Sequence, residues 1–320
     1  MPSLIHEIYL SVVVPLHNEE ESVGILVHKV LESVQPLGLS YEVVLVDDGS
    51  SDRTWEIIEE LVARHKNLSG VKLKRNFGQT SAMVAGFEQA RGEIIVTIDG
   101  DLQNDPADIP MLLDKISEGY DIVSGWRKNR KDHFARVLPS KVANYLISAT
   151  TKVRLHDYGC SLKAYRANCI KALKAYGEMH RFFPALASMS GAQITEVQVN
   201  HYPREHGVSK YGFNRIFKVL SDIFAMNIII RFSSYPLKGF TLSALPFVLL
   251  TLIFGLLGIL AIVLSWTPGK ETFFMLASGL SALAVIHLIT LGILGELVVN
   301  SSDLTHAHLP EITKKEVQVE

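Results

Sequence analysis

The first 125 residues alternate between short apolar runs and longer segments with helical spacing. The short runs are rich in β-branched residues and end at turn residues, which predicts buried strands at residues 10–15, 41–46, 71–73, 93–98 and 120–125. The segments between them predict helices at residues 20–34, 53–65, 80–91 and 106–118. Because strands that alternate with helices form βαβ crossovers, we expect an α/β domain with a mostly parallel sheet.

The pattern changes at Phe213. Apolar residues then recur at three- and four-residue steps as far as Ile228, while Arg215 and Lys218 lie elsewhere on the helix. This spacing predicts an amphipathic helix with a basic edge, which suits a membrane interface. A helix facing the core of a soluble domain would show the same spacing. The position of this segment, shortly before two long apolar runs, favours the membrane interpretation.

The two apolar runs, residues 244–266 and 273–299, are separated by a polar break. Each is long enough to cross the hydrocarbon core of a bilayer, and both exceed the usual length of a core helix in a soluble protein. The expected regions are therefore a globular domain, an interfacial region, a two-helix transmembrane hairpin and a polar tail: residues 1–212, 213–240, 241–300 (helices at about 243–266 and 273–299) and 301–320.

The distribution of basic residues predicts the orientation of this hairpin. Lys and Arg are dense before the first run and recur at Lys314 and Lys315, whereas the loop between the runs carries one Lys. The positive-inside rule then places the N-terminal domain in the cytosol, in a multi-pass protein of a plasma or bacterial inner membrane. Residues 1–11 show no signal-peptide pattern. The net charge of −2 gives no indication of a nucleic-acid partner.

Acidic and polar residues follow three of the predicted strands. They are His17-Asn18-Glu19, Asp47-Asp48 and the pair Asp99 and Asp101. Ligands bind such sheets beyond the carboxyl ends of the strands, so we expect one crevice there. Two acids one residue apart supply the hard oxygens that suit Mg²⁺ or Mn²⁺, and such a cation stabilises a departing pyrophosphate. Alone the pair would also fit a surface turn; its place after a buried strand favours a metal site.

Four ordered segments resemble the successive motifs of glycosyltransferase family 2, which has the GT-A fold: Val12–Glu20, Val46–Thr54, Arg75–Gln79 and Asp99–Pro106. Two later segments, Asp157–Arg166 and Arg204–Tyr211, are similar to the polyprenyl-phosphate glycosyltransferases within it. These include dolichyl-phosphate mannose synthase and the bacterial enzymes that load glucose or formamido-arabinose onto undecaprenyl phosphate. The resemblance covers about residues 8–300.

The resemblance implies a role for each matching position. The donor nucleotide-sugar is expected to contact Pro15, His17, Glu19, Val46, Asp48, Asp99, Gly100, Arg204 and Lys210. The Mg²⁺ or Mn²⁺ ligands are expected to be Asp101 and Gln103. The acceptor phosphate is expected to lie against Arg127, Arg136, Ser140 and Ser209. The family often has Tyr at the position of His17 and Ala at that of Gly100.

Asp101, Arg127 and Asp157 are the candidate catalytic residues. A phosphate monoester is already anionic near neutral pH, so its attack on a sugar does not strictly require a general base. The catalytic residues then have to position two polyanions and stabilise the departing pyrophosphate. Asp157 either orients the acceptor or a sugar hydroxyl, or orders the turn at Tyr158 and Gly159; the sequence leaves both open.

We therefore expect inverting, metal-dependent transfer of one sugar from a nucleotide-sugar, of the UDP type, to undecaprenyl or another polyprenyl phosphate. A homo-oligomer, such as a tetramer, is also expected. Two alternatives are a processive polysaccharide synthase and a non-catalytic membrane scaffold. The synthase normally carries a Gln-x-x-Arg-Trp motif and more spans, which this sequence lacks. The scaffold is expected to have lost the acids or the late Arg204 and Lys210 pair, and both are present.

Overall fold

The computed structural model describes residues 8–128, 148, 153–171, 179–189, 191–203, 236–266 and 269–301. The chain divides into two compact units, Met1–Phe224 and Ala225–Glu320. The predicted amphipathic helix lies outside the described residues, as do residues 213–235 as a whole and most of the predicted tail.

The first unit is built on a seven-stranded sheet with the order β3-β2-β1-β4-β6-β5-β7. The strands are β1 (Leu10–Leu16), β2 (Tyr41–Asp47), β3 (Leu68–Lys72), β4 (Ile94–Thr97), β5 (Ile122–Trp126), β6 (Lys163–Arg166) and β7 (Ile194–Gln198). Neighbouring strands are parallel except at β6, which runs antiparallel to both β4 and β5. The predicted mostly parallel α/β sheet is confirmed.

Helices cover both faces of the sheet. The longer ones are α1 (Val23–Val34), α2 (Thr54–Arg64), α3 (Gln79–Gln89) and α4 (Ile109–Ser117), close to their predicted spans. The shorter ones are α6 (Ala167–Lys171) and α7 (Phe183–Met189), with 3₁₀ turns η1 (Gln35–Leu37), η2 (Pro106–Asp108) and η3 (Met179–Phe182). Alternate residues of β1 separate two hydrophobic clusters: Val12 packs with α1, α2 and α4, and Val13 packs with α3, α6 and α7.

Helix α3 lies unusually close to β1. A Cβ atom at Gly86 would stand 2.3 Å from Cγ1 of Val13, so only glycine permits this approach. In the first turn of the same helix, the side chain of Gln79 donates a hydrogen bond of 2.6 Å to Asp99. The helix thereby brings a polar side chain to the loop that follows β4.

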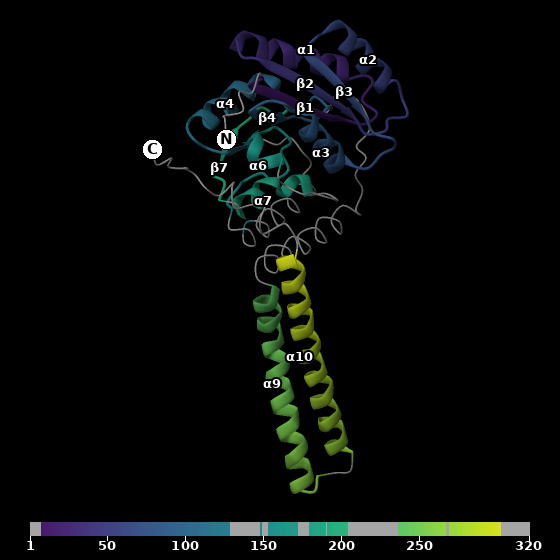
Figure 1. Ribbon diagram of the computed structural model, residues 1–320, viewed down its shortest axis with the longest axis vertical. Coiled ribbons are helices and arrows are strands. Elements are labelled where there is room, and N and C mark those ends of the chain that lie inside the picture. The colour runs from purple at the N-terminus through teal and green to yellow at the C-terminus, as the bar shows by residue number, and fades with distance from the viewer. Residues whose placement is uncertain are drawn as a thin grey trace. The chain divides into compact units, whose positions relative to one another are not determined.

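The described part of the second unit consists of two long helices that pack along each other, α9 (Pro236–Val263) and α10 (Lys270–Ser301) (Figure 1). Both are long and apolar enough to cross a membrane. Only 11% and 6% of the residues in their apolar windows are buried, unlike a core helix of a soluble protein. Glycines bring the helices together: a Cβ at Gly258 would meet Met275 and one at Gly292 would meet Phe240.

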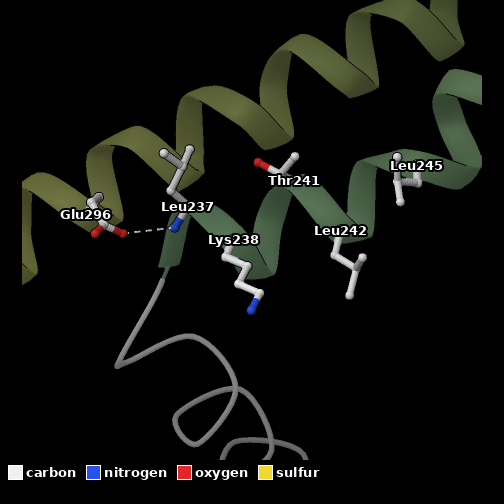
Figure 2. A pocket seen from close by; sticks show the side chains of 6 residues that line it. All are labelled: Leu237, Lys238, Thr241, Leu242, Leu245 and Glu296. Atoms are coloured by element: carbon white, nitrogen blue, oxygen red, sulfur yellow. Dashed lines mark hydrogen bonds between the residues drawn. The ribbon is translucent and has the colours of Figure 1, made fainter.

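Helix α9 is already present at Pro236, the first described residue of the second unit, earlier than the predicted start near residue 243. The polar residues Lys238 and Thr241 interrupt the apolar pattern there, which hides the first turns. Proline suits the first position of a helix because it has no N–H to leave unsatisfied. Glu296 of α10 accepts a hydrogen bond of 3.2 Å from the backbone N–H of Leu237 in that first turn (Figure 2). The two helices are therefore joined by a polar contact where α9 begins.

Candidate functional site

The loops that follow β1 and β2 are joined by hydrogen bonds. The N–H of Asn18 donates to Oγ of Ser50 at 2.9 Å, and the N–H of Ser51 donates back to Oδ1 of Asn18 at 2.8 Å. The N–H of Glu19 donates to Oγ1 of Thr54 at 2.8 Å. Asn18 has a φ of 52°, a left-handed conformation that asparagine tolerates better than most residues. These hydrogen bonds hold the two loops together at the carboxyl edge of the sheet.

Gly100 allows the loop after β4 to pack against the loop after β1. A Cβ atom there would lie 2.5 Å from Cδ2 of Leu16, 3.5 Å from Cγ of Glu19 and 3.6 Å from the carbonyl oxygen of Pro15. Leu16 is buried in the core, so it has little room to move aside. The structure thus brings three predicted donor-binding residues together: Pro15, Glu19 and Gly100.

Asp99 and Asp101 stand one residue apart in the loop after β4. Burial, and next the charge of Asp101, raise the pKa of the Asp99 carboxyl to about 6, although hydrogen bonding to Ser161 and the charges of Arg127 and Lys163 oppose the rise. The carboxyl therefore takes up a proton at mildly acidic pH, where an ordinary aspartate is ionised. A cation bound beside these two carboxylates would reduce the repulsion between their charges.

The backbone between the predicted metal ligands has an unusual conformation. Leu102 has a φ of 59°, in the left-handed region that leucine rarely adopts. The N–H of Gln103 donates to Oδ1 of Asp101 at 3.2 Å, and Tyr202 donates its N–H to the carbonyl of Gln103 at 2.9 Å. The side-chain amide nitrogen of Gln103 also donates to the carbonyl of Tyr202 at 3.4 Å, so the atom that a metal ion would bind is its amide oxygen.

This set of oxygens fits a magnesium or manganese ion. No group of three or more His, Cys, Asp and Glu side chains in the described part of the chain is arranged to hold a metal. Mg²⁺ is commonly bound through one or two carboxylates, and phosphate oxygens of the substrate complete its shell. Asp101 and Gln103 fit that pattern, because their oxygens are hard ligands beside a carboxyl that resists ionisation.

Arg127 and Asp157 form a buried ion pair at the end of β5. Nε of Arg127 lies 2.7 Å from Oδ2 of Asp157, and Nη2 donates to Oδ1 at 3.0 Å. The two side chains are only 10% and 4% exposed. Burial would lower the pKa of the Arg127 guanidinium, but the hydrogen bonds and charge of Asp157 more than offset this and raise it. Arg127 is therefore a permanently charged group in a fixed orientation.

Asp157 also accepts a hydrogen bond of 3.0 Å from the N–H of Gly159. The carboxylate thus orders the turn at Tyr158 and Gly159, one of the two roles that the sequence left open. At the same time it aims Arg127. These contacts suit a residue that orients a neighbour better than one that removes a proton from a substrate.

Two predicted donor-binding residues make contacts within the fold. Both carboxylate oxygens of Asp48 accept backbone N–H groups, from Phe77 at 2.7 Å and from Gly78 at 2.9 Å, so this residue shapes the loop after β3. The side chain of Val46 is fully buried in the cluster beneath α3, which leaves its backbone as the part nearest a ligand. His17 is half-buried in the loop after β1.

Five predicted site residues lie outside the described residues: Arg136, Ser140, Arg204, Ser209 and Lys210. Their roles stay predictions. Conversely, the structure adds two residues to the candidate site: Gln79 donates a hydrogen bond to Asp99, and the charge of Lys163 lies near Asp99. Both stand within segments that carry the family motifs. The sequence pattern does not distinguish them from ordinary helix and strand residues, so only their contacts in the structure identify them.

Residues 11–173 match the family described as Glycosyl transferase family 2. The dodecaprenyl-phosphate galacturonate synthase of Rhizobium johnstonii is 44% identical over 304 residues, which cover 92% of this chain and 88% of that protein. The undecaprenyl-phosphate 4-deoxy-4-formamido-L-arabinose transferase of Pectobacterium carotovorum is 37% identical over 290 residues, covering 90% of this chain and 88% of that protein. The family resemblance noted in the sequence is confirmed.

Solved structures share the fold. Glucosyl-3-phosphoglycerate synthase from Mycobacterium tuberculosis, in complex with Mg²⁺ and uridine diphosphate, aligns with a TM-score of 0.52 at 19% identity and covers 70% of this chain and 79% of that chain. TarS 1–349 of S. aureus, in complex with UDP-GlcNAc, aligns with a TM-score of 0.50 at 21% identity and covers 69% of this chain and 66% of that chain. Both comparisons support the α/β architecture described above.

Proposed function

The chain belongs to glycosyltransferase family 2, and we propose that it transfers a single sugar from a nucleotide-sugar to a polyprenyl phosphate, with inversion at the anomeric carbon. One observation carries the proposal: the Arg127–Asp157 pair is buried within electrostatic range of Asp99, which adjoins Asp101. An anion-binding group therefore stands beside a cation-binding loop. The relatives above, named for dodecaprenyl and undecaprenyl phosphate, supply the class of acceptor.

The chemistry suits this arrangement. An oxygen of the acceptor phosphate attacks the anomeric carbon of the donor, the bond from that carbon to the diphosphate breaks, and the electron pair leaves with the nucleoside diphosphate. No proton has to be removed from the acceptor, since a phosphate monoester is anionic near neutral pH. A divalent cation held by Asp101 and Gln103 would neutralise charge on the departing diphosphate.

Arg127 is the residue best suited to bind the acceptor phosphate. Its bond to Asp157 uses one edge of the guanidinium, and the group has further N–H donors to offer an anion. Because Asp157 restrains the side chain, little entropy is lost when the phosphate binds. Arg136, Ser140 and Ser209 are proposed to complete the acceptor site, and Arg204 and Lys210 to clamp the donor phosphates.

The second unit fits a substrate that is itself a lipid. We propose that α9 and α10 span a plasma or bacterial inner membrane, with the catalytic domain in the cytosol and residues 213–235 at the interface. Lys and Arg are concentrated before α9, which supports this orientation. Association into a homo-oligomer, such as a tetramer, belongs to the same proposal.

A donor screen tests the function. The purified full-length chain in detergent is incubated with undecaprenyl phosphate, Mg²⁺ or Mn²⁺ and a panel of UDP-sugars, and the lipid is analysed by mass spectrometry. The panel includes galacturonate and formamido-arabinose donors, chosen from the sugars named for the relatives. We expect one donor to yield a lipid that carries one sugar, and EDTA to abolish the product.

A matched pair of variants places the reaction in the predicted site. Asp101→Ala is expected to abolish transfer, whereas Asp114→Asn, which changes an exposed acid on α4, leaves it unchanged. Full activity of Asp101→Ala would contradict the metal assignment. Products carrying several sugars would support a processive synthase instead, and no binding of any nucleotide-sugar in calorimetry with Mn²⁺ would support a scaffold.

A further inference from the structure

Lys163 is a buried lysine at the first position of β6. It pairs in register with Thr97 of β4 and with Ser124 of β5, and it is only 3% exposed. Burial lowers the pKa of its ammonium, although the nearby acids Asp157 and Asp99 oppose this. Lysine is seldom fully buried unless its charge and its donors are satisfied. The neighbours of this ammonium therefore indicate why it is there.

The ammonium of Lys163 holds a turn of the backbone. Its Nζ donates to the carbonyl of Tyr158 at 3.2 Å and to the carbonyl of Cys160. These carbonyls flank Gly159, so one side chain ties both sides of the turn to the middle of the sheet. An ammonium has three N–H donors and can bridge two carbonyls in this way.

The same turn positions the ion pair described above. Asp157 lies directly before it and accepts the N–H of Gly159. A Cβ atom at Gly159 would stand 3.3 Å from Nη2 of Arg127, so the turn also lies against the guanidinium itself. A contiguous set of contacts therefore runs from Lys163 through the turn to Asp157 and on to Arg127.

We propose that Lys163 is a positioning residue for sugar transfer: it fixes the turn 157–160 so that Asp157 aims Arg127 at the acceptor phosphate. This inference rests on the proposed function. Lys163 is buried and its ammonium donates to the turn, so we assign it no direct contact with the substrate. Its charge also balances the local acids, since Lys163 and Arg127 together face Asp157 and Asp99.

A residue that merely stabilises the fold would have different kinetic consequences. Lys163→Met keeps the length of the side chain and removes the charge and all three donors. We expect kcat/KM for the polyprenyl phosphate to fall about 100-fold, the loss that a misplaced positioning group produces. We expect the KM for the nucleotide-sugar to change less than this, because Lys163 donates hydrogen bonds to the turn beside Asp157 and acts on Asp99 only through its charge.

A double-mutant cycle provides the decisive readout. If Lys163 acts through Asp157, then Lys163→Met causes little further loss of kcat/KM in an Asp157→Asn background. The matched control is Lys128→Met, which removes an exposed lysine whose Nζ lies 5.6 Å from the centre of the Trp126 ring. This control is expected to retain wild-type activity. Lys163→Gln, which keeps two N–H donors, replaces Lys163→Met if that variant does not fold.

Two results would overturn the inference: wild-type transfer by folded Lys163→Met, or a loss that simply adds to that of Asp157→Asn. Both require active wild-type protein, so they leave the proposed function standing. Wild-type protein that transfers no sugar to a polyprenyl phosphate would instead overturn the proposed function, and this inference with it.

Discussion

At the scale of single residues, the contacts of Asp157 separate two mechanisms. The carboxylate accepts hydrogen bonds from Arg127 and from the backbone, which suits a group that orients its neighbour. We expect Asp157→Asn to lower kcat/KM about 100-fold, because Arg127 loses its charged partner and its fixed direction. The measurement is kcat/KM across pH 5 to 9.

The pH profile distinguishes this role from general-base catalysis. A general base must be ionised to act, so its removal would also remove a limb from the acidic side of the profile. We expect Asp157→Asn to be slower at every pH while the shape of the profile persists. Loss of the acidic limb in the variant would show that Asp157 takes a proton from the substrate.

Asp99 makes a prediction about stability. Its pKa in the folded chain is about 6, above the value of about 4 in an unfolded chain. The folded state therefore binds the proton more tightly, and its stability falls as the pH rises from about 4 to 6. Asp99→Asn removes this dependence. In EDTA we expect the variant to gain on the order of 1 kcal/mol at pH 7 relative to wild type, since partial solvent exposure moderates the effect.

Thermal unfolding in detergent at pH 4.5 and pH 7, with EDTA present, measures this difference. The gain corresponds to about 2–4 °C in the unfolding midpoint at pH 7, and it should shrink at pH 4.5, where the wild-type carboxyl is protonated. An Asp99→Asn variant that is less stable than wild type at pH 7 would contradict the raised pKa.

At the scale of elements, local patterns identify β1 to β5 and the helices between them, but neither the antiparallel strand β6 nor the parallel strand β7 at the edge of the sheet. Strand β6 has only four residues, begins with Lys163 and ends with Arg166, so it shows no apolar run. Its place between β4 and β5 depends on pairs such as Thr97 with Lys163, which are distant in sequence. The acids at the strand ends could be predicted from the sequence. The carboxyl ends of parallel strands lie at one edge of the sheet, whichever strands are neighbours.

The roles of individual side chains at that edge were less predictable. Asp48 is expected to contact the donor, and in the structure its oxygens also accept hydrogen bonds from the backbone of Phe77 and Gly78. Which hydrogen bond a carboxylate makes depends on the conformation of a neighbouring loop, and no spacing in the sequence records that conformation. The burial of Lys163 depends likewise on a turn that its own strand does not contain.

Glu296 tests the contact between the two long helices. Its carboxylate accepts the N–H of Leu237, one of the donors that the first turn of a helix leaves without a partner (Figure 2). We expect Glu296→Ala to destabilise the start of α9 by about 0.5–2 kcal/mol, as loss of a helix cap does. Glu296→Gln keeps an acceptor oxygen and should lose less.

Hydrogen exchange measured by mass spectrometry on a peptide that covers the start of α9 reports this effect directly. The amides near Leu237 should exchange faster in Glu296→Ala than in wild type, with Glu296→Gln in between. Equal exchange in all three proteins would show that the contact does not stabilise the helix.

At the scale of the whole molecule, the function requires the two units to meet different environments. The nucleotide-sugar is water-soluble and the acceptor is a membrane lipid. The chain matches this division, with polar loops at the carboxyl edge of the sheet in one unit and two exposed apolar helices in the other. If both helices span the membrane, the loop between α9 and α10 lies on the side opposite the catalytic domain.

Cysteine labelling of the full-length chain in intact cells tests this arrangement. In a background without Cys160 and Cys169, Thr272→Cys introduces an exposed thiol near the start of α10, and Asp114→Cys introduces one on α4. A maleimide that cannot cross membranes should label Thr272→Cys in intact cells, but label Asp114→Cys only after lysis. Labelling of both only after lysis would mean that the helices enter the membrane without crossing it. The reverse pattern would place the catalytic domain outside the cell, away from cytosolic nucleotide-sugars, and would contradict the proposed orientation.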